Sequence, residues 1–168
     1  RRKVRILAKL GHPNLVAAYD AGERDGTHFL VMEFVDGRAL VTLLKEFGPL
    51  PLGHAVRYVM QAAAGLQCAH PEGLYHRNVK PSNLLVDNQG LLKVIGLGLA
   101  HVDADLAGED NALGSELTVS GQVMVTSDYM SPEQAVDSSR IDQRTDVYAL
   151  GCTLCALVTG RPPYPVKS

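Results

Sequence analysis

One short stretch of the chain concentrates polar side chains that could take part in chemistry. It offers one imidazole, two cationic groups and two amides, from His76, Arg77, Asn78, Lys80 and Asn83. An apolar helical pattern precedes the stretch, and the apolar run Leu84-Leu85-Val86 follows it. Loops held between two such elements commonly carry catalytic groups, because the elements fix the loop while the loop exposes its side chains. The stretch contains no carboxylate, and its two amides have essentially no basicity, so neither Asn78 nor Asn83 could take a proton at neutral pH.

Apolar periodicity predicts the elements that hold this stretch. A helix is expected before it, with an apolar face formed by Leu52, Val56, Val59, Met60, Ala63 and Leu66. After it, Leu84–Val86 and Leu91–Ile95 are expected to pair as a hairpin around turn residues 87–90. The run Val147–Val158 is apolar all round, which predicts a helix buried on every side.

The first part of the chain is expected to mix helix and strand. An apolar stripe over residues 4–10 predicts a helix that ends at Gly11. Leu15–Tyr19 and Phe29–Val35 have strand composition and an Asp-Gly turn signal between them, so they are expected to pair as a hairpin. A short helix is expected over Ala39–Phe47.

A later segment has an unusual charge pattern. Residues 94–139 contain eight carboxylates and neither lysine nor arginine, and their apolar residues follow no sustained period. The segment is therefore expected to be a long loop, and loops of this length in compact domains are usually functional or disordered.

Composition restricts the class of protein. A length of 168 residues suits one globular domain, and a formal net charge of −2 gives no reason to expect nucleic acid or an anionic membrane as a partner. No run reaches the roughly 18 apolar residues of a membrane-spanning helix. The thiols of Cys68, Cys152 and Cys155 do not form a disulfide framework, which suits a reducing compartment and predicts a cytoplasmic location. Cys152 and Cys155 lie in an apolar run and are interpreted as packing residues, not as a metal or redox pair.

Several short motifs occur in the order found in protein kinases. The stretch H-R-x-x-K-x-x-N at residues 76–83 resembles the kinase catalytic loop, H-R-D-x-K-x-x-N. Further matches are His12-Pro13-Asn14, the hinge-like Met32-Glu33-Phe34-Val35, Gly98-Leu99-Ala100, Ser131-Pro132-Glu133 and Asp146-Val147-Tyr148-Ala149-Leu150-Gly151. The wording of residues 129–135 is most similar to bacterial eukaryotic-type serine/threonine kinases.

The resemblance implies an α+β, protein-kinase-like fold with two lobes. Residues 1–35 would form a partial small lobe with the regulatory helix and the hinge hairpin, and residues 36–168 a mostly helical large lobe. ATP and Mg²⁺ would be the cofactors. Adenine would contact the hinge at Met32, Glu33 and Val35, with Leu85 as the apolar floor beneath it.

The same resemblance assigns roles to polar residues of the loop and of the segments around it. Lys80 would stabilise charge on the transferred phosphoryl group, and the Asn83 oxygen would help to hold a metal. Either side chain could instead satisfy backbone groups of the loop. Arg77 would bind a phosphorylated activation loop, and Thr126 would precede the substrate-binding turn.

Three positions depart from the family pattern. Asn78 stands where the family has its catalytic aspartate, and it could simply hydrogen-bond its own backbone, as asparagine often does in loops. Gly96 occupies the position of the main Mg²⁺ ligand, and Mg²⁺ is usually held through one or two carboxylates. Lys3 stands where a glutamate normally pairs with the ATP lysine, although a solvated helix residue is an equal alternative.

These departures predict a catalytically impaired domain, a pseudokinase, that binds ATP weakly or not at all and acts on a protein substrate or a regulatory partner. A working kinase that tolerates Asn78 and Gly96 is one alternative, and a non-functional remnant is another. The family's glycine-rich loop and the strand with the ATP lysine have no counterpart in the chain, so a fragment is expected, with no phosphoryl transfer by the chain as given.

Overall fold

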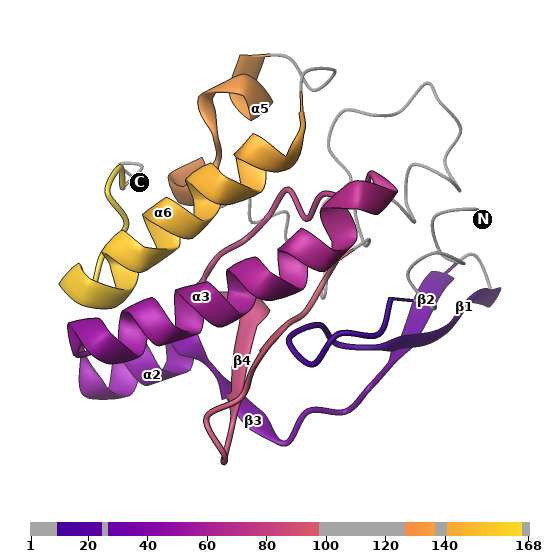
Figure 1. Cartoon of the computed structure of the whole chain (residues 1–168), viewed down its shortest axis with the longest axis horizontal. Helices are drawn as coiled ribbons and strands as arrows, with labels where there is room; N and C mark the ends of the chain where they lie inside the picture. Colours follow the sequence, from indigo (N-terminus) through magenta and orange to yellow (C-terminus); the bar gives the residue numbers. More distant parts are fainter. Residues whose placement is uncertain (1–9, 25–26, 98–126, 137–140, 166–168) are drawn as a thin grey trace.

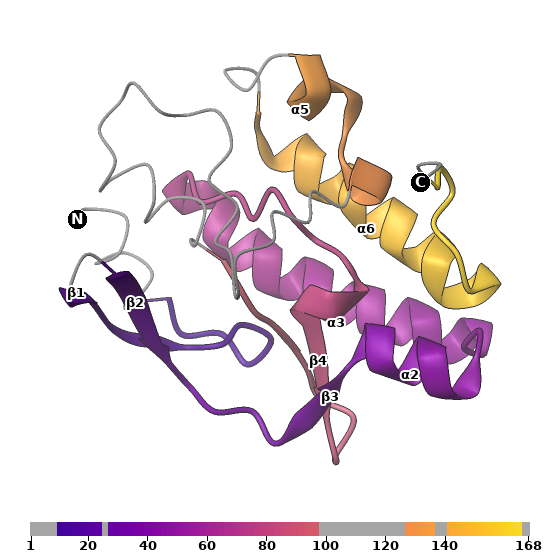
Figure 2. The ribbon, with the colours of Figure 1, turned by 180° about the vertical axis from the view of Figure 1, so that it is seen from behind.

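The computed structural model describes residues 10–24, 27–97, 127–136 and 141–165. A small two-stranded sheet lies to one side of a larger, mostly helical part (Figure 1). The larger part is built on two long helices that pack against each other, α3 (Leu52–Ala69) and α6 (Gln143–Thr159). The view from behind shows the shorter helix α2 (Leu40–Phe47) beside strands β3 and β4 (Figure 2). The predicted combination of a partial small lobe with a mostly helical lobe is confirmed.

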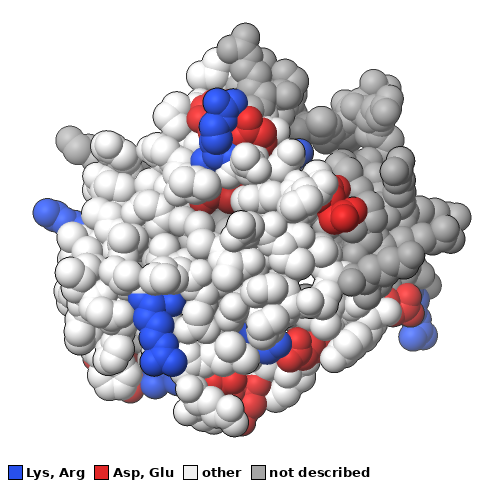
Figure 3. All heavy atoms as spheres, viewed as in Figure 1, with Lys and Arg blue, Asp and Glu red and all other residues white. Residues whose placement is uncertain are grey.

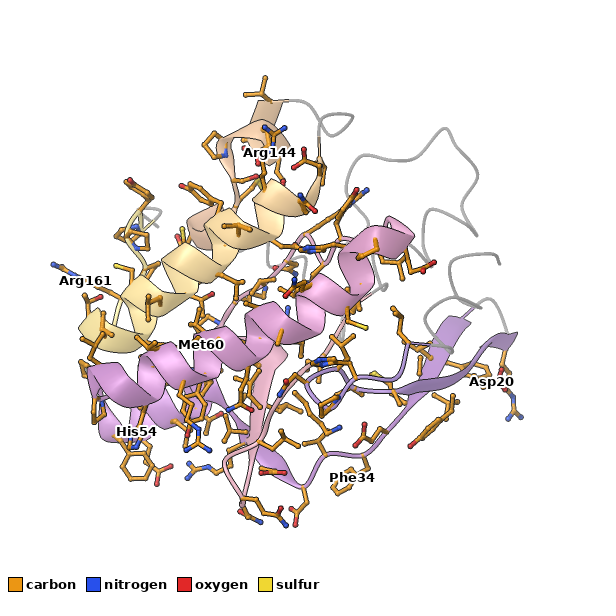
Figure 4. The ribbon with its side chains drawn as sticks, viewed as in Figure 1. Asp20, Phe34, His54, Met60, Arg144 and Arg161 are labelled. Carbon is orange, nitrogen blue, oxygen red and sulfur yellow. The ribbon has the colours of Figure 1, made fainter. Side chains whose placement is uncertain are left out.

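Helix α3 forms where the apolar period predicted it, but the expected apolar face is only partly buried: Leu66, Val59 and Ala63 pack against the core, whereas Leu52, Val56 and Met60 do not. The side that packs inward is made of small residues and one leucine, namely Ala55, Ala62, Gly65, Leu66 and Ala69. Leu52 and Met60 are 65% and 67% exposed, and Figure 4 shows Met60 on the outer side of the helix. Small residues face inward because the chain approaches closely there: a Cβ added at Gly65 would lie 2.9 Å from the Asn14 carbonyl oxygen. The large side chains would not fit at that contact.

A three-stranded antiparallel sheet lies under α3 and has the order β3-β4-β5. The predicted hairpin of β4 (Leu84–Asp87) and β5 (Leu92–Val94) is confirmed, whereas β3 (Gly37–Ala39) was not expected. The buried face carries Leu84, Val86, Leu92 and Val94. Since side chains alternate along a strand, Leu85 and Lys93 lie on the opposite face of the sheet.

The expected hairpin near the start of the chain is also present, with shifted bounds. It consists of β1 (Ala18–Arg24) and β2 (Thr27–Met32). Leu15 does not belong to this hairpin but forms a parallel bridge to Val94, and the Val16 amide donates to the Val94 carbonyl at 3.0 Å. The chain is thereby attached to the larger sheet before it enters β1. The helix expected over residues 4–10 lies almost entirely outside the described residues.

The third part of the described chain is helical. Two short helices, η4 (Ser127–Tyr129) and α5 (Pro132–Val136), precede α6, so the prediction of a continuous loop over residues 94–139 is wrong at 127–136. The prediction that α6 is buried on every side is also wrong, because Val147 is 62% exposed. Its N-terminus is capped by Asp142, whose side chain accepts from the Arg144 amide. Cys152 is buried and Cys155 is partly buried. Among the described helices, none has the length and apolar character needed to cross a membrane.

Candidate functional site

The polar loop predicted from the sequence runs between the short helices η1 (His70–Glu72) and η2 (Pro81–Asn83). The loop is anchored by a buried carboxylate on α6, that of Asp146. Its two oxygens accept hydrogen bonds from the His76 amide at 3.0 Å and the Arg77 amide at 2.8 Å. The His70 Nε2 atom, at the end of α3, lies 2.9 Å from the same carboxylate. Asp146 therefore joins α3, α6 and the loop at one point.

His76 connects the loop to the segment that follows β5. Its side chain is buried, and desolvation by burial lowers the pKa of the imidazole. Nε2 donates to the Ile95 carbonyl at 2.8 Å, and Nδ1 accepts from the Asn78 amide at 3.2 Å. A neutral ring with its proton on Nε2 satisfies both contacts. The imidazole thus links the catalytic loop to the segment that follows β5.

Backbone and amide contacts bring together the residues that the sequence predicted for chemistry. The Asn83 Nδ2 atom donates to the Asn78 carbonyl at 2.7 Å. The Asn83 amide donates to the Lys80 carbonyl, and the Asn83 carbonyl accepts from the Ile95 amide at 3.0 Å. Gly96 follows Ile95 directly. Asn83 is therefore the residue around which Asn78, Lys80 and Gly96 are gathered.

The donors around Asn83 do not fit a magnesium ion. Asn83 uses its amide nitrogen to bind the loop, which leaves one neutral oxygen for a cation. Gly96 has no side chain and adopts a left-handed φ of 83°. Mg²⁺ is usually held through one or two carboxylates in near-octahedral geometry. Within the described ranges, no group of three or more histidine, cysteine, aspartate or glutamate side chains is placed to hold a metal.

The hinge-like segment lies against the larger sheet. Met32 ends β2, and the Glu33 amide donates to the Ala17 carbonyl at 2.9 Å. The Glu33 carboxylate lies 2.9 Å from the Lys93 ammonium, and the hydrogen bond from Lys93 lowers the pKa of Glu33. Lys93 pairs across the sheet with Leu85. Glu33 and Leu85 are therefore linked to the same residue, on the sheet face opposite the core.

The other two hinge residues differ in exposure. The Val35 carbonyl accepts from the Gly37 amide at 2.9 Å, which closes a tight turn before β3. Phe34 is 88% exposed and projects away from the rest of the chain (Figure 4). The hinge consequently has its Glu33 amide and Val35 carbonyl bonded within the chain and carries an uncovered aromatic ring at Phe34.

Arg77 has an uncommon backbone. Its φ of 65° lies in the left-handed region, which is rare for residues other than glycine. Its Nε atom is buried and has no hydrogen-bond partner among the described residues. Burial lowers the pKa of the guanidinium group from its ordinary value. The two other residues predicted as regulatory, Lys3 and Thr126, lie outside the described residues.

Sequence reasoning missed or misjudged several contacts here. No partner for Glu133 was predicted from the sequence, and the Thr145 hydroxyl donates to its carboxylate at 3.0 Å. Gln134 was given no role, and its side chain reaches the Arg77 carbonyl. The only available signal was its place directly after the Ser131-Pro132-Glu133 motif.

Nearby, Asp142 and Arg144 form an ion pair in the charged cluster at the start of α6, while most of the face shown over α3 is uncharged (Figure 3).

The fold and the site together define a protein kinase. The family model described as the protein kinase domain matches residues 1–168, so the chain belongs to the protein kinase family. A solved structure of Rad53 in complex with AMP-PNP covers 99% of this chain at a TM-score of 0.74 and 24% identity, which shows the fold. The match takes in 39% of that chain.

Its curated relatives are bacterial serine/threonine kinases. The chain is 38% identical over 168 residues to the serine/threonine-protein kinase PknB of Mycobacterium leprae, a match over 98% of this chain and 26% of PknB. It is 41% identical over 172 residues to a probable serine/threonine-protein kinase of Corynebacterium efficiens, over 100% of this chain and 25% of that protein. The chain therefore spans about a quarter of the length of these relatives.

Proposed function

We propose that this serine/threonine kinase domain is catalytically impaired and works as a pseudokinase. One observation carries the proposal: the loop is still held by Asp146, His76 and Asn83, yet the position of the base holds Asn78 and the position of the metal ligand holds Gly96. An amide cannot act as a general base, and a glycine cannot bind a metal through a side chain. Loss of a positioned base alone typically lowers a rate by about 10²–10⁴-fold.

In this proposal the nucleotide site is weakened but not erased. Met32, Glu33 and Val35 would border adenine, with Leu85 beneath it, and Lys80 would lie near the phosphates. The Glu33–Lys93 pair supports this placement, because it holds the hinge close to the sheet face that carries Leu85. Without a carboxylate at position 96, Mg²⁺ would contribute little to ATP binding. Arg77, Thr126 and Lys3 are the proposed regulatory positions.

The proposed setting follows from the same reasoning. The partner would be a protein substrate or a regulatory protein, and free cysteines favour a cytoplasmic location. Residues 1–35 are proposed as the small-lobe part and residues 36–168 as the large-lobe part.

A second candidate is a working kinase that tolerates both substitutions. The geometry of the loop favours this candidate. Lys80 and Asn83 occur at the family's positions and are bonded to each other through their backbones, and Asp146 binds two consecutive loop amides. A non-functional remnant remains the third candidate.

Phosphoryl transfer by the full-length protein distinguishes these candidates. The unaltered protein is compared with Asn78→Asp/Gly96→Asp, and Asn88→Asp/Gly11→Asp, at exposed positions, is the matched control. If the domain is impaired, the unaltered protein and the control variant should show equally low rates of transfer. The repaired variant should be faster than both by at least about 10²-fold. Robust transfer by the unaltered protein would contradict the proposal. Thermal shift with ATP, with Mg²⁺ or with EDTA, separates a nucleotide-binding pseudokinase from a remnant.

A further inference from the structure

The side chain of Gln134 forms a bridge between α5 and the catalytic loop. Its Nε2 atom donates to the Arg77 carbonyl at 2.7 Å. Its Oε1 atom accepts from the Ser131 amide at 3.1 Å and lies 3.2 Å from the Ser131 hydroxyl, which can donate to it. Both ends of the glutamine amide are thus used, and they contact segments 57 and three residues away in the sequence.

The carbonyl that Gln134 binds belongs to the peptide unit between Arg77 and Asn78. The N–H of the same unit donates to His76 Nδ1 at 3.2 Å. A peptide unit is planar, so binding its oxygen on one side and its N–H on the other fixes the orientation of the plane. That plane determines where the Asn78 side chain starts. Gln134 therefore acts on the position at which the family carries its base.

The backbone at this point requires such support. The left-handed φ of Arg77 is strained and persists only where surrounding contacts enforce it. Asp146 accepts from the N–H of Arg77, and Gln134 donates to the carbonyl of the same residue. The two contacts come from different elements, α6 and α5, and hold the strained residue between them.

Gln134 is itself anchored and does not move as an independent surface side chain. The hydroxyl of Ser131 is fully buried and lies 3.4 Å from the hydroxyl of Thr145 on α6. Thr145 is also fully buried and donates to Glu133, the residue before Gln134. Gln134 is therefore linked to α6 through Ser131, whose amide donates to the glutamine and whose single hydroxyl proton is then available for Thr145.

We propose that Gln134 is a positioning residue for the catalytic loop, which orients the Arg77–Asn78 peptide and couples it to residues 131–136. The contact uses backbone atoms of the loop. It therefore serves the same purpose with asparagine or with aspartate at position 78, and it does not depend on the proposed loss of transfer.

Residue-resolved amide hydrogen exchange in the full-length protein tests this directly. Gln134→Met keeps the size of the side chain and removes both polar contacts, and Gln67→Met at an exposed site of α3 is the matched control. We expect exchange at the Arg77 and Asn78 amides to accelerate about tenfold, the effect of losing one hydrogen bond that resists local opening. Amides in the middle of α3 should keep their rates. Unchanged rates at residues 77 and 78, or an equal acceleration throughout α3 and α6, would overturn the proposal.

A second variant separates the donor from the rest of the side chain. Gln134→Glu keeps an acceptor for Ser131 but cannot donate to the Arg77 carbonyl while it is ionised. Exchange at residues 77 and 78, relative to the unaltered protein at each pH, should be faster near neutrality. It should return toward the unaltered rate as the pH falls through about 4, because a protonated carboxyl group can donate again. If the ratio of the exchange rates in Gln134→Glu and in the unaltered protein did not change with pH, the role assigned to the Gln134 Nε2 donor would be contradicted.

A kinetic arm rests on the proposed function and uses the repaired protein, Asn78→Asp/Gly96→Asp. Adding Gln134→Met should lower kcat about tenfold and leave the KM for ATP unchanged, because the glutamine orients the base position and lies away from the hinge. An unchanged kcat would overturn the role in transfer. If the repaired protein shows no transfer at all, the proposed function fails, and the exchange experiment still decides the role of Gln134.

Discussion

Two kinds of residue lie in and around the catalytic loop, those that anchor its backbone and those at its proposed reacting positions, and their contacts with the rest of the protein differ greatly. The residues that anchor its backbone, above all Asp146 and His76, form a connected set of buried hydrogen bonds. The residues at its reacting positions, Asn78 and Gly96, contribute no side-chain hydrogen bond within the described part of the chain. Changing a reacting residue therefore costs the fold little, whereas changing an anchor affects three elements at once. In the proposed function, this difference is the physical reason why the domain would lose its chemistry and keep its shape.

The largest effect is expected at the anchor. Asp146→Ala removes the acceptor of two loop amides and of His70 and leaves buried donors unsatisfied, so the free energy of unfolding should fall by about 3–5 kcal/mol. Urea denaturation measures this. Asp36→Ala at an exposed site is the matched control and should lie within about 0.5 kcal/mol of the unaltered protein. Equal effects of the two substitutions would remove the distinction between anchors and reacting positions.

A smaller cost is expected when the metal-ligand position is repaired. Gly96 has a left-handed φ, and an aspartate there would be strained, so Gly96→Asp should destabilise the fold by about 1 kcal/mol. Gly11→Asp, at an exposed glycine with no atom near its Cβ position, provides the comparison in the same denaturation experiment. If Gly96→Asp is as mild as the control, backbone strain does not oppose repair.

The hinge pair should make a modest, pH-dependent contribution. Lys93 lowers the pKa of Glu33, so the stabilisation is complete above the unfolded value of about 4.3 and is lost as the pH falls through the lower folded value. Lys93→Met should cost about 0.5–1 kcal/mol at pH 7 and less in acid. Denaturation curves at pH 7 and pH 3 measure the difference. A cost that stays constant with pH would exclude the ion pair as its cause.

The smallest effect is expected at the base position. The Asn78 side chain makes no hydrogen bond to the described residues, so Asn78→Asp should change the free energy of unfolding by less than about 0.5 kcal/mol. Asn88→Asp in the exposed β4–β5 turn is the matched control. A loss of more than about 1 kcal/mol would show that asparagine at position 78 was retained for stability.

The sequence predicted those elements whose signal is local. The β4–β5 hairpin follows from two apolar runs and a turn, and helix α2 follows from its apolar period. Strand β3 was missed, because Gly37-Arg38-Ala39 has no strand composition and becomes a strand only by pairing with β4. The face of α3 was misjudged because size, not hydrophobicity, decides which side can approach Asn14.

The contacts within the site were beyond local reasoning for a similar cause. Lys93 reaches Glu33 across 60 residues, and Gln134 reaches Arg77 across 57. Neither pair has a sequence signal until the fold has brought its members together. By contrast, the gathering of Asn78, Lys80 and Asn83 followed from their spacing in one loop.

Gly65 also limits how the two-stranded sheet can be connected to the helices. The backbone of Asn14 and the side chain of Leu15 pass close to α3 at this glycine, so that a Cβ there would lie 2.9 Å from the Asn14 carbonyl oxygen and 3.1 Å from Leu15 Cδ2. The next residues, Leu15 and Val16, are bonded to Val94, two residues before Gly96. Any side chain at position 65 would therefore displace the segment that joins the small sheet to the strand leading into the site.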